Sequence, residues 1–408
     1  MPPKSGGTEI IMLSILVAPF YIALNLYVIL RFFGWLESCH KIFKLKRFKI
    51  SIAVAYTVFA FTLLIAFFMP PGSQLRRFVQ LLSNYWLGIF LYTLLIVAVG
   101  HLLSLLLRRV FKVLPKDFFK NRKNHIISGA ITLALITSVS AYGMIHAQNI
   151  QLKEYTVGIE KNMEKPLKVI LVADWHLGYS IGKSHMQKMV KMINEQNPDL
   201  VCVAGDIYDN NYDAIENPEE IADILSGIQS TYGTYACWGN HDVDEKILGG
   251  FTFNYKSEKS HNPAMEEFFQ RAKITLLEDE LRLIDDRFYV AGRVDGEKPG
   301  TVGNQRKTPE ELLTGADRTK PIFVIYHEPD EFAELADAGT DLLLCGHTHD
   351  GQLFPGNLTV KLAWENAYGY LKKGSMHNIV TSGIGVWGPF MRVGTNSEVV
   401  SITVNGAQ

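Results

Sequence analysis

The sequence is poor in cysteine, has no marked excess of charge and contains no repeated segment. Its 408 residues include four cysteines, Cys39, Cys202, Cys237 and Cys345, whose spacing fits neither a disulfide framework nor a zinc finger. Lys and Arg total 40 against 41 Asp and Glu, giving a net charge of −1, so the basic surface typical of a nucleic-acid-binding protein is excluded. The absence of repeats and of low-complexity stretches argues against a solenoid or a disordered chain.

Hydrophobic residues are concentrated near the N-terminus. The chain is 48% hydrophobic and only 20% charged, which is more apolar than an average soluble domain, and it is long enough for two units. Four apolar runs could each cross ~30 Å of hydrocarbon as a helix. They cover residues 10–33, 50–69, 81–107 and 126–147. A cleaved signal peptide for the first run and buried soluble helices for the others are the alternatives, but four successive runs favour a transmembrane domain over residues 1–147.

The distribution of basic residues predicts the orientation of these spans. Loops on the cytoplasmic side of a membrane are enriched in Lys and Arg. The link between the first two runs carries five basic residues and the link between the last two carries seven, whereas the opposite side has only Lys4, Arg76 and Arg77. A multi-pass cell-membrane protein with an extracytoplasmic C-terminal domain is therefore expected. The spans contain no carboxylate, which argues against a transporter, and their polar residues Asn25, Asn84 and His101 mark either a lipid groove or helix-packing hydrogen bonds.

Residues 148–408 alternate between short apolar runs and amphipathic segments. Nearly continuous apolar runs of the kind that buried strands show cover residues 169–173, 200–204, 234–238, 322–326 and 342–345. Helical patterns cover residues 184–196, 218–228, 263–273 and 329–338. This alternation predicts an α/β domain, and a hairpin around Asp285 and Asp286 with a final strand near residues 399–403 would complete a second sheet.

Each of the five apolar runs ends at residues that could bind a metal ion. The carboxyl ends of strands in an α/β sheet converge on one crevice, and carboxylate, amide and imidazole groups suit Mn, Fe or Zn. A lone Gly-Asp is usually a turn and a lone His is usually a satisfied polar residue, so the ordered set carries the argument. The candidate ligands are Asp174, His176, Asp206, Asn240, His327, His347 and His349. Asp206 follows Gly205 and can offer one oxygen to each of two ions.

The three cysteines after residue 200 stand just before these polar motifs. Cys202, Cys237 and Cys345 each lie in an apolar run, where a small buried thiol is expected. A pairing of Cys202 with Cys237 on neighbouring strands is left open by the sequence.

The motifs Asp174-Trp175-His176, Gly205-Asp206, Gly239-Asn240-His241-Asp242, His327 and Gly346-His347-Thr348-His349 resemble those of the calcineurin-like metallophosphoesterase superfamily, over residues 167–404. With the N-terminal spans, they look like its membrane-associated members, whose relatives include enzymes that cleave UDP-diacylglucosamine-type lipid pyrophosphates. The resemblance implies a four-layer α-β-β-α sandwich. It assigns Asp174, His176 and His349 to one metal and Asn240, His327 and His347 to the other, with Asp206 bridging them. Asp350 departs from the small residue that is usual at its position.

By this resemblance the chain is a metal-dependent phosphoric ester hydrolase. Two divalent ions, with Mn preferred over Zn, Fe or Mg, would activate a bridging hydroxide. His241 neighbours a ligand without being needed as one, so it is expected either to protonate the leaving oxygen or to stabilise the transition state, with Asp242 orienting its ring. A surface imidazole is the alternative for His241. The expected substrate is a membrane-borne phosphoester or pyrophosphate. A soluble nucleotide or phosphomonoester is the alternative substrate, and a ligand-binding membrane sensor is the alternative outside the enzymes.

Some residues near these motifs have two possible roles. Asp209 is either an acceptor for a ligand imidazole or a solvated loop carboxylate. Arg392 either contacts a substrate phosphate or is solvated. The aromatic residues Trp238, Trp387 and Phe390 either form an apolar lip or pack in the core.

Overall fold

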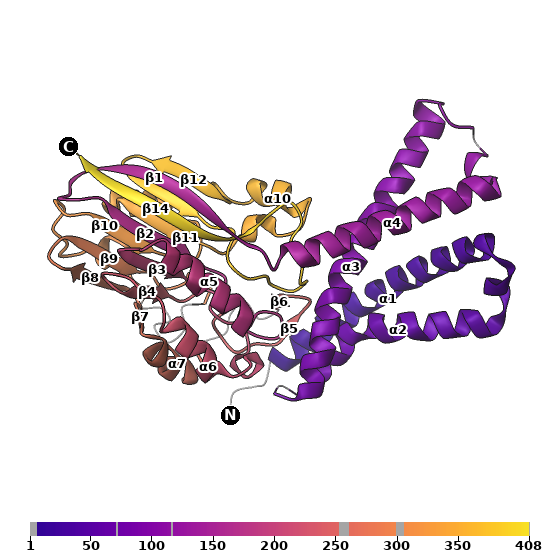
Figure 1. Cartoon of the computed structure of the whole chain (residues 1–408), viewed down its shortest axis with the longest axis horizontal. Coiled ribbons are helices and arrows are strands. Elements are labelled where there is room, and N and C mark those ends of the chain that lie inside the picture. The colour runs from indigo at the N-terminus through magenta and orange to yellow at the C-terminus, as the bar shows by residue number, and fades with distance from the viewer. Residues whose placement is uncertain (1–5, 71, 116, 253–260, 299–305, 408) are drawn as a thin grey trace. The chain divides into compact units, whose positions relative to one another are not determined.

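The computed structural model of the chain (Figure 1) describes residues 6–70, 72–115, 117–252, 261–298 and 306–407. By its internal contacts the chain divides into two compact units. The helical unit comprises Met1–Met144 together with Ile247–Asn254, and the α/β unit comprises Ile145–Lys246 and Tyr255–Gln408. The segment Ile247–Asn254 thus groups with the helices although its neighbours in sequence belong to the α/β unit.

Four long helices form most of the helical unit. They are α1 (Gly6–Cys39), α2 (Lys46–Phe68), α3 (Gln74–Leu105), which continues as a π-helical turn over Leu106–Val110, and α4 (Arg122–His146). Within them, Ala18–Cys39, Lys46–Phe68, Gln74–Val110 and Arg122–His146 are long and apolar enough to cross a membrane. α2 ends before Met69 and Pro70, because a residue that precedes proline disfavours helical geometry, and the Ser73 hydroxyl caps α3 by accepting from the amide of Arg76. The four predicted apolar helices are confirmed.

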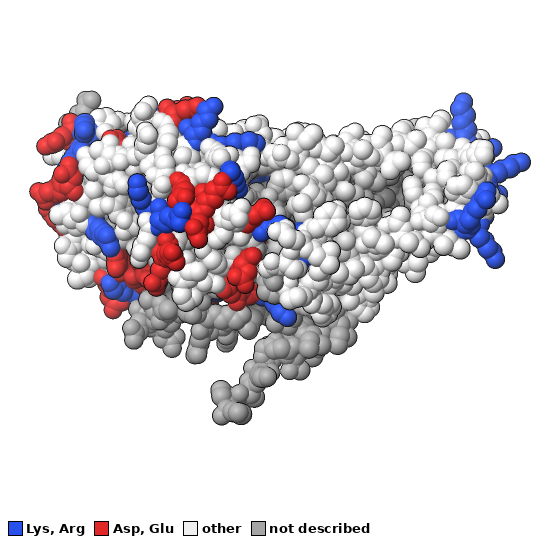
Figure 2. Space-filling model, turned by 60° about the horizontal axis from the view of Figure 1, so that its bottom comes forward, with Lys and Arg blue, Asp and Glu red and all other residues white. Residues whose placement is uncertain are grey.

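The helices bury polar side chains against one another and expose large apolar ones. Tyr56 donates from α2 to the side-chain oxygen of Asn25 on α1 at 2.9 Å. His101 on α3 lies 3.2 Å from the hydroxyl of Tyr27 on α1, and the amide nitrogen of Gln80 donates to Asn84 within α3. The polar residues of the predicted spans therefore make hydrogen bonds within and between helices. Lys and Arg gather at one end of the helical unit (Figure 2).

The α/β unit contains two six-stranded sheets. The first has the order β1-β14-β2-β3-β4-β7 and the second the order β12-β13-β11-β10-β9-β8. The strands of the first sheet are β1 (Ile150–Asn162), β14 (Ser397–Ala407), β2 (Leu167–Val172), β3 (Leu200–Ala204), β4 (Thr234–Cys237) and β7 (Ile274–Leu276). Those of the second are β12 (Gly369–Lys373), β13 (Met376–Val380), β11 (Leu342–Cys345), β10 (Ile322–Ile325), β9 (Phe288–Gly292) and β8 (Glu280–Ile284).

Parallel pairing sets the direction of the central strands. β2, β3, β4 and β7 run parallel in the first sheet, and β9, β10, β11 and β13 run parallel in the second. The loops that follow these strands therefore leave each sheet at one edge. The predicted hairpin is the antiparallel pair β8 and β9, which are joined by Asp285, Asp286 and Arg287. Asp285 and Asp286 have left-handed φ angles of 50° and 52°.

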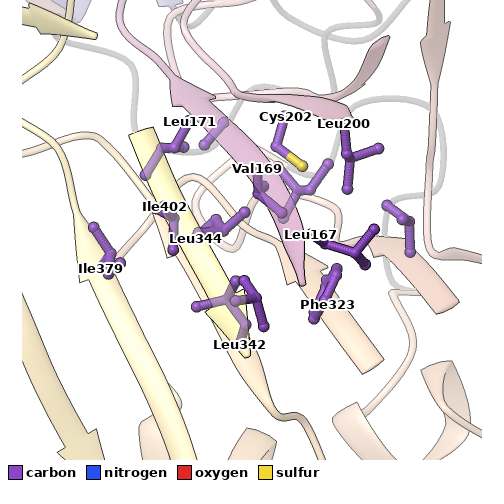
Figure 3. Close-up of a cluster of buried hydrophobic side chains, with 14 of the residues drawn as sticks. Leu167, Val169, Leu171, Leu200, Cys202, Phe323, Leu342, Leu344, Ile379 and Ile402 are labelled. Carbon is purple, nitrogen blue, oxygen red and sulfur yellow. The ribbon is translucent and has the colours of Figure 1, made fainter. Parts of the chain in front are cut away.

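The two sheets pack face to face around one apolar core. Leu167, Val169 and Leu171 of β2 meet Phe323 of β10 and Leu344 of β11 in a cluster of fully buried side chains (Figure 3). Cys202 and Cys237 belong to the same cluster and are free thiols, so the disulfide that the sequence left open is absent here. Apolar strands with both faces covered explain the continuous hydrophobic runs.

Helices cover the outer faces of the two sheets. On the first sheet these are α5 (Lys183–Glu195), α6 (Pro218–Leu225) and α7 (Ala264–Ala272) (Figure 1). The second sheet is covered by α8 (Pro309–Leu312) and α9 (Phe332–Asp337). The short helix α10 (Gly356–Thr359) follows β11, and the two-stranded hairpin of β5 (Ile247–Leu248) and β6 (Phe251–Thr252) belongs to the helical unit. The four-layer α-β-β-α architecture is confirmed.

Candidate metal centre

The seven predicted metal ligands lie on five loops, each of which directly follows a parallel strand. Asp174 and His176 follow β2, Asp206 follows β3, and Asn240 follows β4. From the second sheet, His327 follows β10, and His347 and His349 follow β11. Six of the seven are buried, with exposed fractions of 9% or less, and His347 is partly exposed. The structure brings all seven together, although four of them come from the first sheet and three from the second.

The backbone of these loops adopts conformations that non-glycine residues rarely take. Five of the seven predicted ligands have a left-handed φ angle: Asp174, His176, Asp206, His347 and His349. Such strain costs roughly 1–3 kcal/mol per residue and is typical of functional sites, where the surrounding structure maintains it. A Cβ on Gly205 would lie 2.8 Å from the backbone of Gly239, so the β3 and β4 loops approach each other only because both positions are glycine.

A first group of donor atoms gathers around His176. Its Nε2 lies 3.0 Å from Nε2 of His349 and 3.6 Å from Oδ2 of Asp206, and Nε2 of His349 lies 3.6 Å from Oδ1 of Asp174. Asp174, His176 and His349 form one of the described clusters whose ligand atoms are close enough to hold a single ion.

A second group gathers around His327. Its Nε2 lies 3.1 Å from Oδ1 of Asn240 and 3.3 Å from Nδ1 of His347, and Nδ1 of His347 lies 3.2 Å from the same oxygen of Asn240. One carboxylate oxygen belongs to both groups, because Oδ2 of Asp206 lies 3.2 Å from Nε2 of His327. Asp206 therefore lies between the two groups.

The chemistry of the second group fits a cation. Nδ1 of His327 lies 2.8 Å from the backbone carbonyl of Ala204, so this nitrogen carries the hydrogen and a neutral ring presents a lone pair at Nε2. That lone pair faces the carbonyl oxygen of Asn240 and a carboxylate oxygen of Asp206, both of which are acceptors. Acceptor atoms that converge without a proton between them are satisfied by a positive charge. A divalent ion meets this requirement, since metal-binding histidines commonly fix their tautomer in the same way.

The pKa values of the histidines reflect burial and the nearby carboxylates. Burial alone would lower the pKa of His327, but the carboxylate of Asp206 outweighs it and the pKa is raised. Burial lowers the pKa of His347 to about 3 and lowers that of His349 as well. These two rings stay neutral, which is the form that binds metals.

His241 lies beside the first group with its ring partly exposed. Its Nδ1 lies 3.4 Å from Oδ1 of Asp209, and its backbone amide donates to Oδ1 of Asp206 at 2.8 Å. The same oxygen of Asp209 lies 3.3 Å from Nδ1 of His176. Asp209 therefore lies beside both imidazoles. Of the two roles that the sequence left open, this position favours an acceptor for a ligand imidazole over a solvated loop carboxylate.

Asp242 occupies a different place from the one that we expected. Its Oδ1 accepts from the backbone amides of Ile207 at 2.7 Å and Tyr208 at 3.0 Å, and its Oδ2 accepts from that of Gly239 at 2.8 Å. The side chain is fully buried and ties the β3 loop to the β4 loop. This geometry corrects the expectation that Asp242 orients His241. The turn directs the side chain of Asp242 inward and that of His241 outward, so the two side chains diverge although the residues are neighbours in sequence.

Arg392, Trp238 and Phe390, for which the sequence left two roles open, are all buried. Arg392 is fully buried and its guanidinium donates to backbone carbonyls, the shortest contact being 2.5 Å to Ser382, so it is not a solvated loop residue. Trp238 is 3% exposed and stacks on the ring of His261 at 4.0 Å, which is core packing rather than a lip. Phe390 is buried as well.

Some contacts of the site were not anticipated from the sequence. The ring of Trp364 meets His347 edge to face, with 5.1 Å between the ring centroids. The amide of Gln352 donates to the backbone carbonyls of Trp387 and Pro389 and joins the β11 loop to the loop after β13. No local signal in the sequence marks Trp364.

Comparisons with known proteins agree with this geometry. Residues 167–351 match the family model described as calcineurin-like phosphoesterase. The "Transmembrane protein with metallophosphoesterase domain" of Danio rerio is 30% identical over 350 residues, which cover 81% of this chain and 75% of that protein. Phosphodiesterase YaeI of Escherichia coli is 29% identical over 228 residues, 54% of this chain and 76% of that protein. UDP-2,3-diacylglucosamine pyrophosphatase LpxG of Chlamydia trachomatis is 23% identical over 236 residues, 48% and 69% respectively.

Fold, donor groups and relatives lead to one conclusion. Two of these relatives are named as a phosphodiesterase and a pyrophosphatase, and the expectation of a metal-dependent hydrolase is confirmed. The apolar helices and the transmembrane relative make this a membrane protein. The chain belongs to the calcineurin-like metallophosphoesterase family.

Proposed function

We propose that the protein is a membrane-anchored hydrolase that uses two divalent metal ions to cleave a phosphoester or pyrophosphate bond of a membrane-borne substrate. The observation that carries the proposal is the position of Asp206. Its Oδ2 is within 3.6 Å of His176 Nε2 in one donor group and within 3.2 Å of His327 Nε2 in the other. A carboxylate shared by two groups of ligands is suited to holding two ions near each other.

The residues of the two groups would hold one ion each. Asp174, His176 and His349 form the first set, Asn240, His327 and His347 form the second, and Asp206 belongs to both. Mixed carboxylate, amide and imidazole ligands favour Mn over Mg, with Zn and Fe as further candidates. Bound there, two divalent ions would activate a water molecule for attack and neutralise charge on the phosphoryl oxygens.

His241 is the proposed proton donor to the leaving oxygen. Its ring is 14% exposed and therefore reachable by a substrate. Oδ1 of Asp209 lies 3.4 Å from Nδ1 of this ring, which leaves Nε2 to face the substrate. Asp242 contributes indirectly, since it fixes the backbone of the loops that carry Asp206 and Asn240.

Two features favour a membrane-borne substrate. The connection between α4 and β1 is only Ala147–Asn149, so the α/β unit is tethered directly to a span. In addition, Leu358 and Leu362 are 56% and 88% exposed on the segment between His349 and Trp364, next to the second donor group. An exposed apolar segment beside a site is suited to lipid. The relative LpxG is named as a UDP-2,3-diacylglucosamine pyrophosphatase, which supports a lipid-linked pyrophosphate as the substrate class here.

The catalytic unit is proposed to be extracytoplasmic. The basic links between α1 and α2 and between α3 and α4 satisfy the positive-inside rule when they are cytoplasmic. With four spans, the α/β unit after α4 then lies outside.

The test is hydrolysis by the full chain in detergent with Mn, Zn or Mg. Chromogenic phosphomonoester and phosphodiester substrates are compared with a diacylglucosamine-linked pyrophosphate, using Asn240→Ala, His241→Ala and, as a surface control, Lys153→Ala. We expect metal-dependent turnover, highest with the lipid substrate, that both site variants lose and the control retains. Higher turnover of a soluble nucleotide or phosphomonoester would support the alternative substrate. Binding of two metals without turnover of any substrate would contradict the enzyme and support a sensor.

A further inference from the structure

A buried arginine lies next to the first donor group. Arg392 is fully buried, and its guanidinium is surrounded by backbone carbonyl oxygens. Nη2 donates to Ser382 at 2.5 Å and to Gly385 at 2.8 Å, and Nη1 donates to the carbonyl of His349 at 3.4 Å. Burial lowers the pKa of Arg392 to about 10, so the side chain stays charged at neutral pH. Burying a cation costs free energy unless its donors make hydrogen bonds. The guanidinium therefore requires the acceptors that surround it.

We propose that Arg392 is a positioning residue that fixes His349 relative to Asp174 and thereby holds the first metal site in shape. This role rests on the two-metal function proposed above. Within that function, Arg392 would align the first of the two metal sites. Arg392 contacts two loops, one of which packs on Asp174 while the other carries His349.

The first loop reaches Asp174. Residues 382–385 follow β13, and their backbone pairs with the segment after β2, since the amides of Ile384 and Gly385 donate to the carbonyls of Ala173 at 2.9 Å and Asp174 at 2.8 Å. A Cβ on Gly383 would lie 2.6 Å from Cβ of Asp174. The loop thus packs directly on the ligand, and Arg392 holds the loop by its carbonyl oxygens.

The second loop carries His349. Besides the carbonyl contact, Nη2 of Arg392 lies 3.4 Å from Nδ1 of His349, on the side of the ring away from Nε2. The segment after Arg392 is tied to the same loop, because the hydroxyl of Thr395 donates to the carbonyl of Gln352 at 2.8 Å and the amide of Val393 donates to it at 3.2 Å. Arg392 therefore borders His349 from its backbone to its ring.

The ligands of the first site come from two different sheets, so a further contact is needed to hold them in place relative to one another. Asp174 and His176 follow β2 of one sheet, whereas His349 follows β11 of the other. The distance of 3.0 Å between His176 Nε2 and His349 Nε2 thus depends on how the two sheets are held at this edge. The contacts described for Arg392 include His349 but no member of the second group, so its loss should affect one metal site selectively.

The experiment measures metal content and affinity of the full chain in detergent for wild type, Arg392→Met and Arg392→Lys. Arg293→Met serves as a matched control, because Arg293 is also fully buried and bonds to Glu331 and Lys307, neither of which is a ligand. Bound Mn or Zn is counted by elemental analysis, affinity is obtained by competition with a chelator, and the melting temperature of the metal-free protein is recorded. Loss of a side chain that contacts a metal ligand typically lowers the affinity for the metal about 10–100-fold.

We expect wild type to bind two ions and Arg392→Met to bind one with unchanged affinity and the other about 10–100-fold more weakly. Arg392→Lys, which keeps the charge but reaches fewer carbonyls, should show a smaller loss at the same site. Arg293→Met should lower the melting temperature and keep both ions. The proposal is overturned if either folded Arg392 variant binds both ions as wild type does, or if Arg293→Met loses an ion to the same extent. Failure of wild type to bind two ions would instead refute the two-metal function.

Discussion

Oδ1 of Asp209 lies 3.4 Å from Nδ1 of His241. The same oxygen lies 3.3 Å from Nδ1 of His176, so one carboxylate serves the proposed proton donor and a proposed metal ligand together. Burial alone would raise the pKa of Asp209, but hydrogen bonding to the two imidazoles lowers it to about 2. Asp209 is therefore ionised at every pH at which the enzyme would work.

This contact predicts how His241 and Asp209 variants depend on the leaving group. Loss of a general acid costs about 10²–10⁴-fold in rate when the leaving oxygen is basic, and little when it leaves unaided, as nitrophenolate does. His241→Ala should therefore lose far more activity on alkyl than on nitrophenyl esters. Asp209→Asn should show the same trend with a loss of about 10–100-fold. Equal losses on both ester types, measured as kcat, would exclude proton donation by His241.

The shared carboxylate predicts a distinctive metal content for Asp206→Ala. Because Oδ2 of Asp206 lies near both His176 and His327, its removal weakens both sites, whereas His349→Ala and Asn240→Ala each remove a ligand from one. Elemental analysis should give fewer than one ion per chain for Asp206→Ala and about one for each single-site variant. Retention of one tightly bound ion by Asp206→Ala would show that this residue does not bridge.

The ligands and most strands could be predicted because both depend on local sequence. A buried strand such as β3 is a continuous apolar run, and a ligand such as Asp206 follows it directly. The partners of side chains could not be predicted in the same way. Asp242 adjoins His241 in sequence but bonds to the β3 loop, because the turn after Asn240 sends the two side chains apart. The burial of Arg392 depends on two loops, from β11 and β13, that are distant in sequence.

The place of Asp242 predicts a stability defect rather than a chemical one. Its carboxylate accepts three backbone amides, and Asp242→Asn would present an amide nitrogen to at least one of these donors. A buried donor left unsatisfied costs about 1–3 kcal/mol. The melting temperature of the metal-free protein should fall accordingly in Asp242→Asn, with a larger fall in Asp242→Ala. An unchanged melting temperature with abolished turnover would favour the direct role that the sequence suggested.

Metal binding should strengthen as the pH rises through about 6. Burial raises the pKa of Asp174 to about 6, above its ordinary value of 3.8, so the folded metal-free protein binds more protons than the unfolded chain between these values. Through this group, stability without metal decreases as the pH rises from about 4 to 6 and changes little above that. A metal ion needs the ionised carboxylate. The rise in melting temperature caused by Mn should therefore be small at pH 5 and large at pH 7, and a rise of equal size at both would exclude Asp174 as a ligand.

The orientation of the protein can be tested through Cys39. This cysteine is partly exposed, whereas Cys202, Cys237 and Cys345 are fully buried, so thiol labelling of the folded protein reports on one position. Because Cys39 ends α1 beside the basic link, it is expected on the cytoplasmic side. An impermeant maleimide should label it in permeabilised cells only. In a Cys39→Ser background, Glu154→Cys on the exposed face of β1 should be labelled in intact cells, and the reverse pattern would place the catalytic unit in the cytoplasm.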